Sequence, residues 1–171
     1  MYSRIKLTKT AFILLLIAIL FNSCSSDDDA PSSEDSDYFL TAKIDGVDFS
    51  GDASSLVSIQ ADGTDFFNIK GISSNGDQIT ITLISPTATG IFPMSNETGV
   101  LAPRTTFSIP SGENWSTHVL QGTEIIGSGT ATVSINDDTY MEGTFSFIGY
   151  NPLDNFSAKV ITEGKFKAKK L

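Results

Sequence analysis

The feature that most constrains the fold is a period-two alternation of apolar and polar residues along the chain. It is clearest in Ile79–Leu83, Ala131–Ile135 and Phe145–Phe147, where apolar side chains occupy every second position and Thr or Ser fills the others. A β-strand places such alternate residues on one face, so this pattern is typical of half-buried antiparallel strands. No segment after residue 23 shows sustained helical periodicity.

Turn residues separate the alternating runs at intervals that suit short strands. Asn-Gly and Asp-Gly pairs accept the positive φ of tight hairpin turns. The predicted turns are Asp45-Gly46, Asp62-Gly63, Asn75-Gly76, Asn136–Asp138 and Glu163-Gly164. The predicted strands are Phe39–Ile44, Val47–Ser50, Ser55–Gln60, Phe66–Ile72, Gln78–Ile84, Thr105–Ile109, Gly129–Ile135, Tyr140–Ile148, Phe156–Ile161 and Gly164–Ala168. We therefore expect an all-β domain, an antiparallel meander of about eight to ten strands, and the pattern leaves open a sandwich or a partly closed barrel.

One segment, Ser85–Gly127, is less regular. It holds four of the six prolines, the only Trp and the only His. Prolines move strands to edges and loops, and irregular loops on a β scaffold often carry binding residues. We expect a binding site to involve this segment, and a single helical turn at Ser95–Thr98.

The first 23 residues have the layout of a secretory signal peptide. Three basic residues precede an apolar run of eleven residues, Ala11–Phe21, whereas a membrane span needs about 20. Phe21–Cys24 resembles the cleavage and acylation site of a lipoprotein precursor, although such sites more often carry Leu and then Ala or Ser where this chain has Phe21 and Asn22. Cys24 is the only cysteine, and lipidation accounts for an unpaired thiol in an oxidising compartment, with a free thiol as the alternative. We expect acylated Cys24 to hold the protein to a lipid bilayer.

Residues 24–37 contain six acidic residues and no basic one. They lack an apolar cluster, so we expect a solvated tether between the anchor and a single β domain at 38–171. Within the tether, Ser26, Asp27, Asp28 and Asp29 resemble the acidic export signal of Bacteroidetes-type lipoproteins, which implies the outer face of the outer membrane. A generic acidic linker facing the periplasm is the alternative.

The charge balance argues against a nucleic-acid partner. Removing the signal peptide lowers the number of basic residues from 11 to 8, against 20 acidic ones, which gives a net charge of −12. Such a surface repels phosphate backbones, and nucleic-acid binding depends on neutralising them.

Three short motifs occur near the ends of the predicted domain: Phe39–Phe49, Gly143–Phe147 and Ile161–Phe166. The first is similar to the opening F-x-A-x-[IV]-[ND]-G-x-x-[FW], and the other two to the closing GTFSF and ITxGxF, of a family of small β-rich lipoproteins of Bacteroidetes type. The resemblance implies an exported, lipid-anchored protein with an all-β domain. The family has no assigned activity that would predict one for this chain.

Residues suited to catalysis are few. A single histidine excludes a two-histidine zinc site, and no nucleophile elbow or phosphate-binding loop occurs. His118 as a base for Ser111 or Ser116, oriented by Glu113 or Glu124, is the alternative to a structural histidine. We expect no enzymatic activity.

The sequence predicts no cofactor. Calcium bound by the acid-rich loops at 45–52, 62–65 and 136–138 is the alternative to solvated acidic turns, since calcium prefers oxygen ligands.

Three residues are candidate ligand contacts: Trp115, His118 and Tyr150. An exposed Trp115 stacks on a sugar or a partner's apolar patch, whereas a buried one belongs to the core. The sequence predicts a non-enzymatic surface module that binds a glycan or an envelope protein through Ser85–Gly127. A structural subunit of an outer-membrane assembly and a glycan-processing enzyme with paired carboxylates are the alternatives.

Overall fold

The computed structural model describes residues 37–53, 57–61, 64–84, 89–94 and 102–170. The predicted signal peptide, Cys24 and the acidic tether lie outside these residues, as do the Asp62-Gly63 turn and the Ser95–Thr98 helical turn. Residues 36–171 form one compact unit. The described residues contain no helix, and so none long and apolar enough to cross a membrane.

Thirteen strands occur in the described residues. They are β1 (Phe39–Ile44), β2 (Val47–Ala53), β3 (Val57–Ala61), β4 (Thr64–Ser73), β5 (Gln78–Ile84), β6 (Gly90–Pro93), β7 (Arg104–Ser108), β8 (Asn114–Ser116), β9 (Val119–Gln121), β10 (Glu124–Ile126), β11 (Ser128–Asn136), β12 (Tyr140–Asn151) and β13 (Ser157–Lys169).

Eight of these strands close into a ring. Their order is β13-β1-β2-β4-β5-β7-β8-β12, and pairing of β12 with β13 completes it. Each pairing in the ring is antiparallel, and the junction of β8 with β12 is a single residue pair, Ser116 with Tyr150. The predicted all-β antiparallel fold is confirmed, and the ring is a closed barrel rather than an open sandwich.

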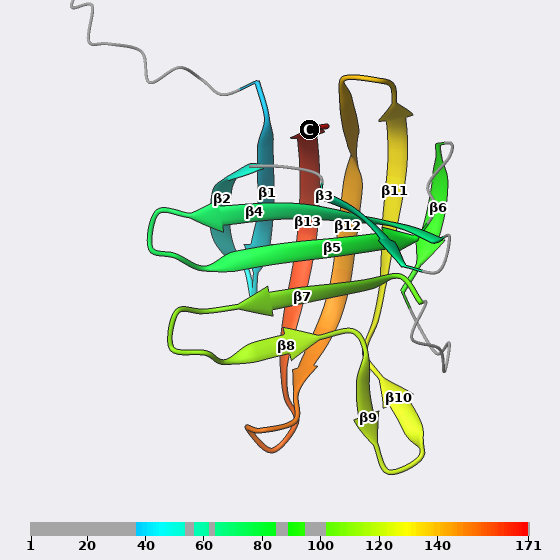
Figure 1. The fold of residues 1–171 in the computed structure, drawn as a ribbon. Coiled ribbons are helices and arrows are strands. Elements are labelled where there is room, and N and C mark those ends of the chain that lie inside the picture. Colours follow the sequence, from blue (N-terminus) through cyan, green and yellow to red (C-terminus); the bar gives the residue numbers. More distant parts are fainter. Residues whose placement is uncertain (1–36, 54–56, 62–63, 85–88, 95–101, 171) are drawn as a thin grey trace, which may run out of the picture. The chain divides into compact units, whose positions relative to one another are not determined.

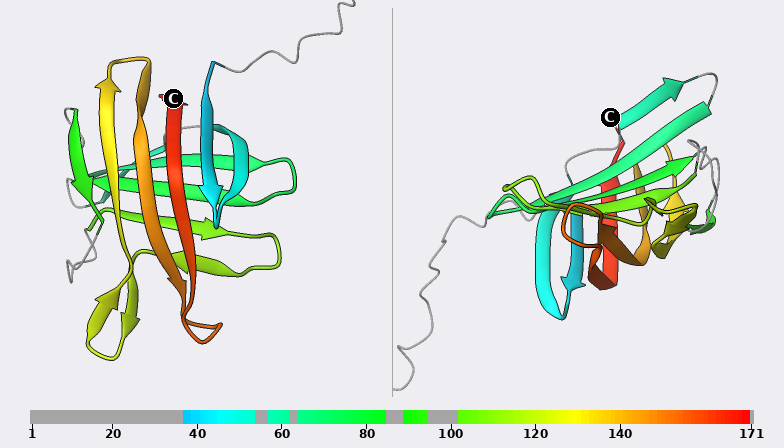
Figure 2. Two further views of the ribbon diagram at one scale, coloured as in Figure 1. Left: turned by 180° about the vertical axis from the view of Figure 1, so that it is seen from behind. Right: turned by 90° about the horizontal axis from the view of Figure 1, so that it is seen from below.

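The barrel is flattened into two layers whose strands cross steeply. β1, β13, β12 and β11 run across β4, β5 and β7, and seen from behind they pass in front of them (Figures 1 and 2). Crossed layers of this kind turn corners where strands pass from one layer to the other. The remaining strands extend the barrel: β11 and β6 continue from β12, β3 pairs with β4, and β9 with β10 forms a separate hairpin.

The period-two pattern accounts for the core. Leu40 on β1, Ile79 and Ile81 on β5, and Phe166 on β13 have no exposed surface, while the residues between them are partly or fully exposed. Burying one such side chain contributes about 1.5–3 kcal/mol. The apolar faces of the two layers therefore hold the barrel together.

The predicted turn at Glu163-Gly164 is wrong. β13 continues through these residues. Ile161 pairs with Phe147 and Gly164 with Phe145, so β13 advances three positions where β12 advances two. The extra residue forms a β-bulge, in which Glu163 has φ 53°. A Cβ on Gly164 would lie 2.7 Å from the Phe145 ring, so that ring packs directly on the glycine.

The predicted irregularity of Ser85–Gly127 is only partly correct. This segment contains β6 to β10, of which the sequence predicted only β7. The missed strands have three or four residues, too few for a period to be recognised. Pro93 lies in β6, which in the described part of the chain pairs with β11 alone, and an edge strand tolerates its missing N–H.

Candidate functional site

Four hairpin turns lie at the same end of the barrel because neighbouring strands of the ring run in opposite directions. The turns are residues 45–46, 74–77, 109–113 and 152–156. The chain enters β1 and leaves β13 at the opposite end. We call the end with the four turns the mouth; barrel mouths are common ligand sites.

A cleft of about 800 Å³ opens at the mouth. Its aromatic lining residues are Phe49, Phe107 and Trp115, each only 4–5% exposed, so a small part of each ring borders the cleft. Carboxylates occur on three different hairpins: Asp48 on β2, Asp77 in the β4–β5 turn and Glu113 in the β7–β8 turn. Other lining groups are Ile44, Val47, Ser50, Ser73, Ser74, Asn75, Ile109 and Lys159. A cleft lined by both apolar and polar groups can hold a ligand that has both kinds of surface.

Trp115 belongs to the core and to the wall of this cleft. Its ring stacks on Phe107 with 5.6 Å between centroids, and its Nε1 donates a hydrogen bond of 3.1 Å to Ser157 Oγ. The Lys159 Nζ lies 5.6 Å from its ring centroid. The sequence left burial and ligand contact open, and the structure places Trp115 where its indole is buried yet adjacent to any molecule in the cleft.

Asp45 fastens the β1–β2 turn to the start of β13. Its Oδ2 accepts a hydrogen bond of 2.8 Å from Lys159 Nζ, and its Oδ1 accepts one of 2.9 Å from the Val160 amide. The Asp45 amide donates to the Val160 carbonyl at 2.9 Å. The hydrogen bonds from Lys159 and Val160 lower the pKa of this carboxyl. Asp45 has φ 50° and Gly46 φ 84°, which is the predicted tight turn, but nothing in the sequence indicated its partner on β13.

His118 and Tyr150 lie outside the cleft, on either side of Ser116. The His118 main-chain amide donates 3.1 Å to Ser116 Oγ, and Tyr150 pairs with Ser116 across the seam that closes the barrel. Both side chains are half-buried. The imidazole takes no part in the bond to Ser116, and Glu113 accepts from Ser111 Oγ at 3.0 Å. The residues of the hypothetical Ser–His–acid site are therefore not linked in the order that such a site requires.

Of the acid-rich loops that the sequence offered for calcium, the one at 62–65 lies partly outside the described residues. Across the described ranges, no group of three or more His, Cys, Asp or Glu side chains is placed to hold a metal ion. Asp137 instead accepts hydrogen bonds from the Thr139 and Tyr140 amides at 2.7 and 2.9 Å, which lower the pKa of its carboxyl. Its loop is thus a turn closed by its own side chain.

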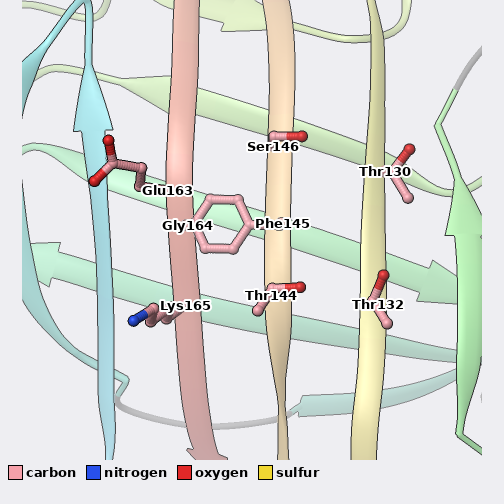
Figure 3. Close-up of a pocket in the computed structure, with 8 residues that line it drawn as sticks. All are labelled: Thr130, Thr132, Thr144, Phe145, Ser146, Glu163, Gly164 and Lys165. Atoms are coloured by element: carbon pink, nitrogen blue, oxygen red, sulfur yellow. The ribbon is translucent and has the colours of Figure 1, made fainter.

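A second, shallower hollow of about 380 Å³ lies on the outer face of β11, β12 and β13. Figure 3 shows its four hydroxyl side chains, Thr130 and Thr132 on β11 and Thr144 and Ser146 on β12. They form two cross-strand pairs, Thr130 with Ser146 and Thr132 with Thr144. Its one aromatic lining residue, Phe145, is buried, so the hollow offers a ligand hydroxyl groups and the charged groups of Glu163 and Lys165.

Comparison with known proteins gives one family match. The profile of a family described as a domain of unknown function, DUF6252, matches residues 37–168. No curated protein and no solved structure matches the chain.

Proposed function

We propose that this chain, which belongs to the DUF6252 family, is a lipid-anchored, non-enzymatic binding module that takes a saccharide into the cleft at the barrel mouth. The observation that carries the proposal is the cleft of about 800 Å³, whose lining combines three aromatic side chains with hydroxyl, amide and carboxylate groups. Saccharides combine apolar ring faces with hydroxyl groups, and sites of this size and mixed lining suit such molecules.

The proposed anchor is Cys24, acylated before residues 1–23 are removed and joined to the domain by residues 24–37. The acidic residues Asp27–Asp29 support export to the outer face of the outer membrane. Because β1 begins at the end of the barrel opposite the mouth, a tether attached there leaves the mouth accessible. This arrangement suits capture of a ligand from the surroundings of the cell.

The single tryptophan provides the test. We would use the chain from residue 24 onward with Cys24→Ser, which is soluble because it cannot be acylated. Trp115 is the only Trp and lines the cleft, so a bound oligosaccharide should change its fluorescence saturably. It should also raise the melting temperature, since free ligand at a hundred times its dissociation constant stabilises by about 2.7 kcal/mol.

A pair of matched variants identifies the site. Ser50 and Ser146 are both exposed serines on strands, one in the mouth cleft and one in the outer hollow. Ser50→Tyr should abolish binding by filling the cleft, and Ser146→Tyr should leave it unchanged. The opposite result would place the site on the outer face. If no oligosaccharide of a broad panel changes the fluorescence or the melting temperature, the saccharide module is rejected. Crosslinking on intact cells would then test the structural-subunit alternative.

The anchor is tested separately. In the full chain, Cys24→Ser should abolish labelling of the protein with radioactive palmitate, and the variant should keep residues 1–23, because cleavage follows acylation. Protease added to intact cells should remove the wild-type domain if it faces the exterior. A domain that is protected until the outer membrane is opened would place it in the periplasm.

A further inference from the structure

The charges around the mouth cleft do not balance. Three carboxylates line it, those of Asp48, Asp77 and Glu113. In the described part of the chain, Lys159 is the one cation of the lining, and Asp45 already pairs with it at 2.8 Å, N to O. Lys43 lies opposite Asp48 on β1 and attracts its carboxylate, but the Lys43 Nζ already pairs with Glu163 at 2.9 Å. Among the described residues, the carboxylates around the cleft therefore outnumber the cations, in a chain whose net charge is −9. Clefts lined by one sign of charge concentrate ligands of the opposite sign.

The ammonium group of Lys159 contacts both a carboxylate and an aromatic ring beside the cleft. Its Nζ lies between the Asp45 carboxylate and the Trp115 ring, 5.6 Å from the ring centroid. This is within the range of a cation–π contact, which stabilises an ammonium over an indole. Two more carboxylates and two more aromatic side chains line the same cleft: Asp48, Glu113, Phe49 and Phe107.

We propose that the mouth selects saccharides that carry an ammonium group, that is, oligosaccharides of amino sugars with free amines. The proposal rests on the saccharide-binding function above and adds the charge that the ligand must have. The sugar rings contact the aromatic side chains of the cleft, and the ammonium groups lie near the carboxylates of Asp48, Asp77 and Glu113. Saccharides bearing carboxylates or sulfates are rejected because like charges at an interface are unfavourable.

Three oligosaccharides of equal length separate charge from shape: a glucosamine oligomer, its N-acetylated neutral counterpart and an oligouronate. With the soluble Cys24→Ser chain at low salt, the glucosamine oligomer should bind on the order of tenfold more tightly than the neutral one, and the oligouronate should not bind. The difference should shrink as salt is raised, because exposed charges are screened with a Debye length of about 10 Å at 0.1 M.

Neutralising carboxylates of the cleft should remove the preference. Asp48→Asn and Glu113→Gln should weaken binding of the glucosamine oligomer more than binding of the neutral oligomer, so that the ratio of the two affinities falls towards one. Asp138→Asn and Glu142→Gln make the same change in charge at the start of β12, the end opposite the mouth, and should change neither affinity by more than about twofold.

The outcomes distinguish the two proposals. Equal binding of the amino and N-acetyl oligomers, with no salt dependence of their ratio, overturns charge selection and leaves the saccharide module standing. If none of the three oligosaccharides binds, and no member of the broad oligosaccharide panel binds either, the saccharide-binding function is overturned. Binding of a lysine-rich peptide in the cleft without any saccharide would overturn the ligand class and favour a protein partner.

Discussion

Truncation of Trp115 to Ala tests the assignment of this residue to the core. The change removes the ring stacked on Phe107, the hydrogen bond to Ser157 and the contact with Lys159. Stacking contributes about 0.5–1.5 kcal/mol beyond burial, and a neutral hydrogen bond about the same. With the cavity left behind, Trp→Ala at a buried site costs about 3–5 kcal/mol. A domain of this size has about 5–15 kcal/mol in total, so the variant should be severely destabilised.

Thermal and urea unfolding of the soluble Cys24→Ser chain measure the effect. Trp115→Ala should lower the melting temperature by roughly 10–20 °C and reduce the urea midpoint without a large change in slope. Ser157→Ala removes only the acceptor of the Nε1 hydrogen bond and should cost about 1 kcal/mol. Trp115→Phe keeps a stacked ring and should fall between the two.

The refuting result is a Trp115→Ala chain that melts within about 2 °C of the unsubstituted one, which corresponds to well under 1 kcal/mol. An indole that contributes so little cannot be 95% buried and stacked as described. In that case, Trp115 would return to being an exposed residue available for direct ligand contact.

Two further predictions concern a glycine and a carboxylate. Gly143→Ala should destabilise by at least about 1–3 kcal/mol, because its Cβ would collide with the Thr132 carbonyl oxygen on β11. Gly90→Ala is the matched control, since nothing lies within 4 Å of its Cβ position, and equal melting temperatures of the two variants would contradict the close approach of β11 and β12. Asp45 has a folded-state pKa below 3.8 because Lys159 and a main-chain amide bind its carboxylate, so its contribution is present above about pH 4 and is lost as pH falls through the lowered value. Asp45→Asn should therefore make the melting temperature fall less between pH 5 and 3. An unchanged pH profile would show that the hydrogen bonds of the Asp45 carboxylate contribute nothing to stability.

Much of the fold follows from local pattern. The bounds of β1 and β5 match the predicted strands, and the long strands β11 and β12 were predicted with ends one to three residues short. These segments were predictable because each has enough alternating residues to display a period. β8, β9 and β10 have only three residues each and form where neighbouring strands supply hydrogen-bond partners. Their presence therefore cannot be predicted from a local sequence pattern.

The candidate site was only partly predictable. Trp115 was identified as a residue of interest, and the structure does place it at the cleft, but Phe49, Asp48 and Asp77 come from outside the segment in which a site was expected. His118 and Tyr150 were chosen for their chemistry, and the structure places both at the β8–β12 seam. Sequence separation hides such groupings, because the ring brings together hairpins that lie far apart in the chain.

By itself, the sequence determined that the domain is all-β and antiparallel, which side chains of Ile79–Leu83 and Phe145–Phe147 face the core, and where the tight turn at Asp45-Gly46 falls. These are properties of single strands and turns, set by the alternation of side chains and by local φ preferences. Only the tertiary structure decided that the sheet closes into a barrel, that Glu163-Gly164 is a bulge, and that four hairpins surround one cleft. Closure depends on the pairing of β12 with β13 and on one residue pair between β8 and β12, and such long-range register is not encoded in any local stretch of sequence.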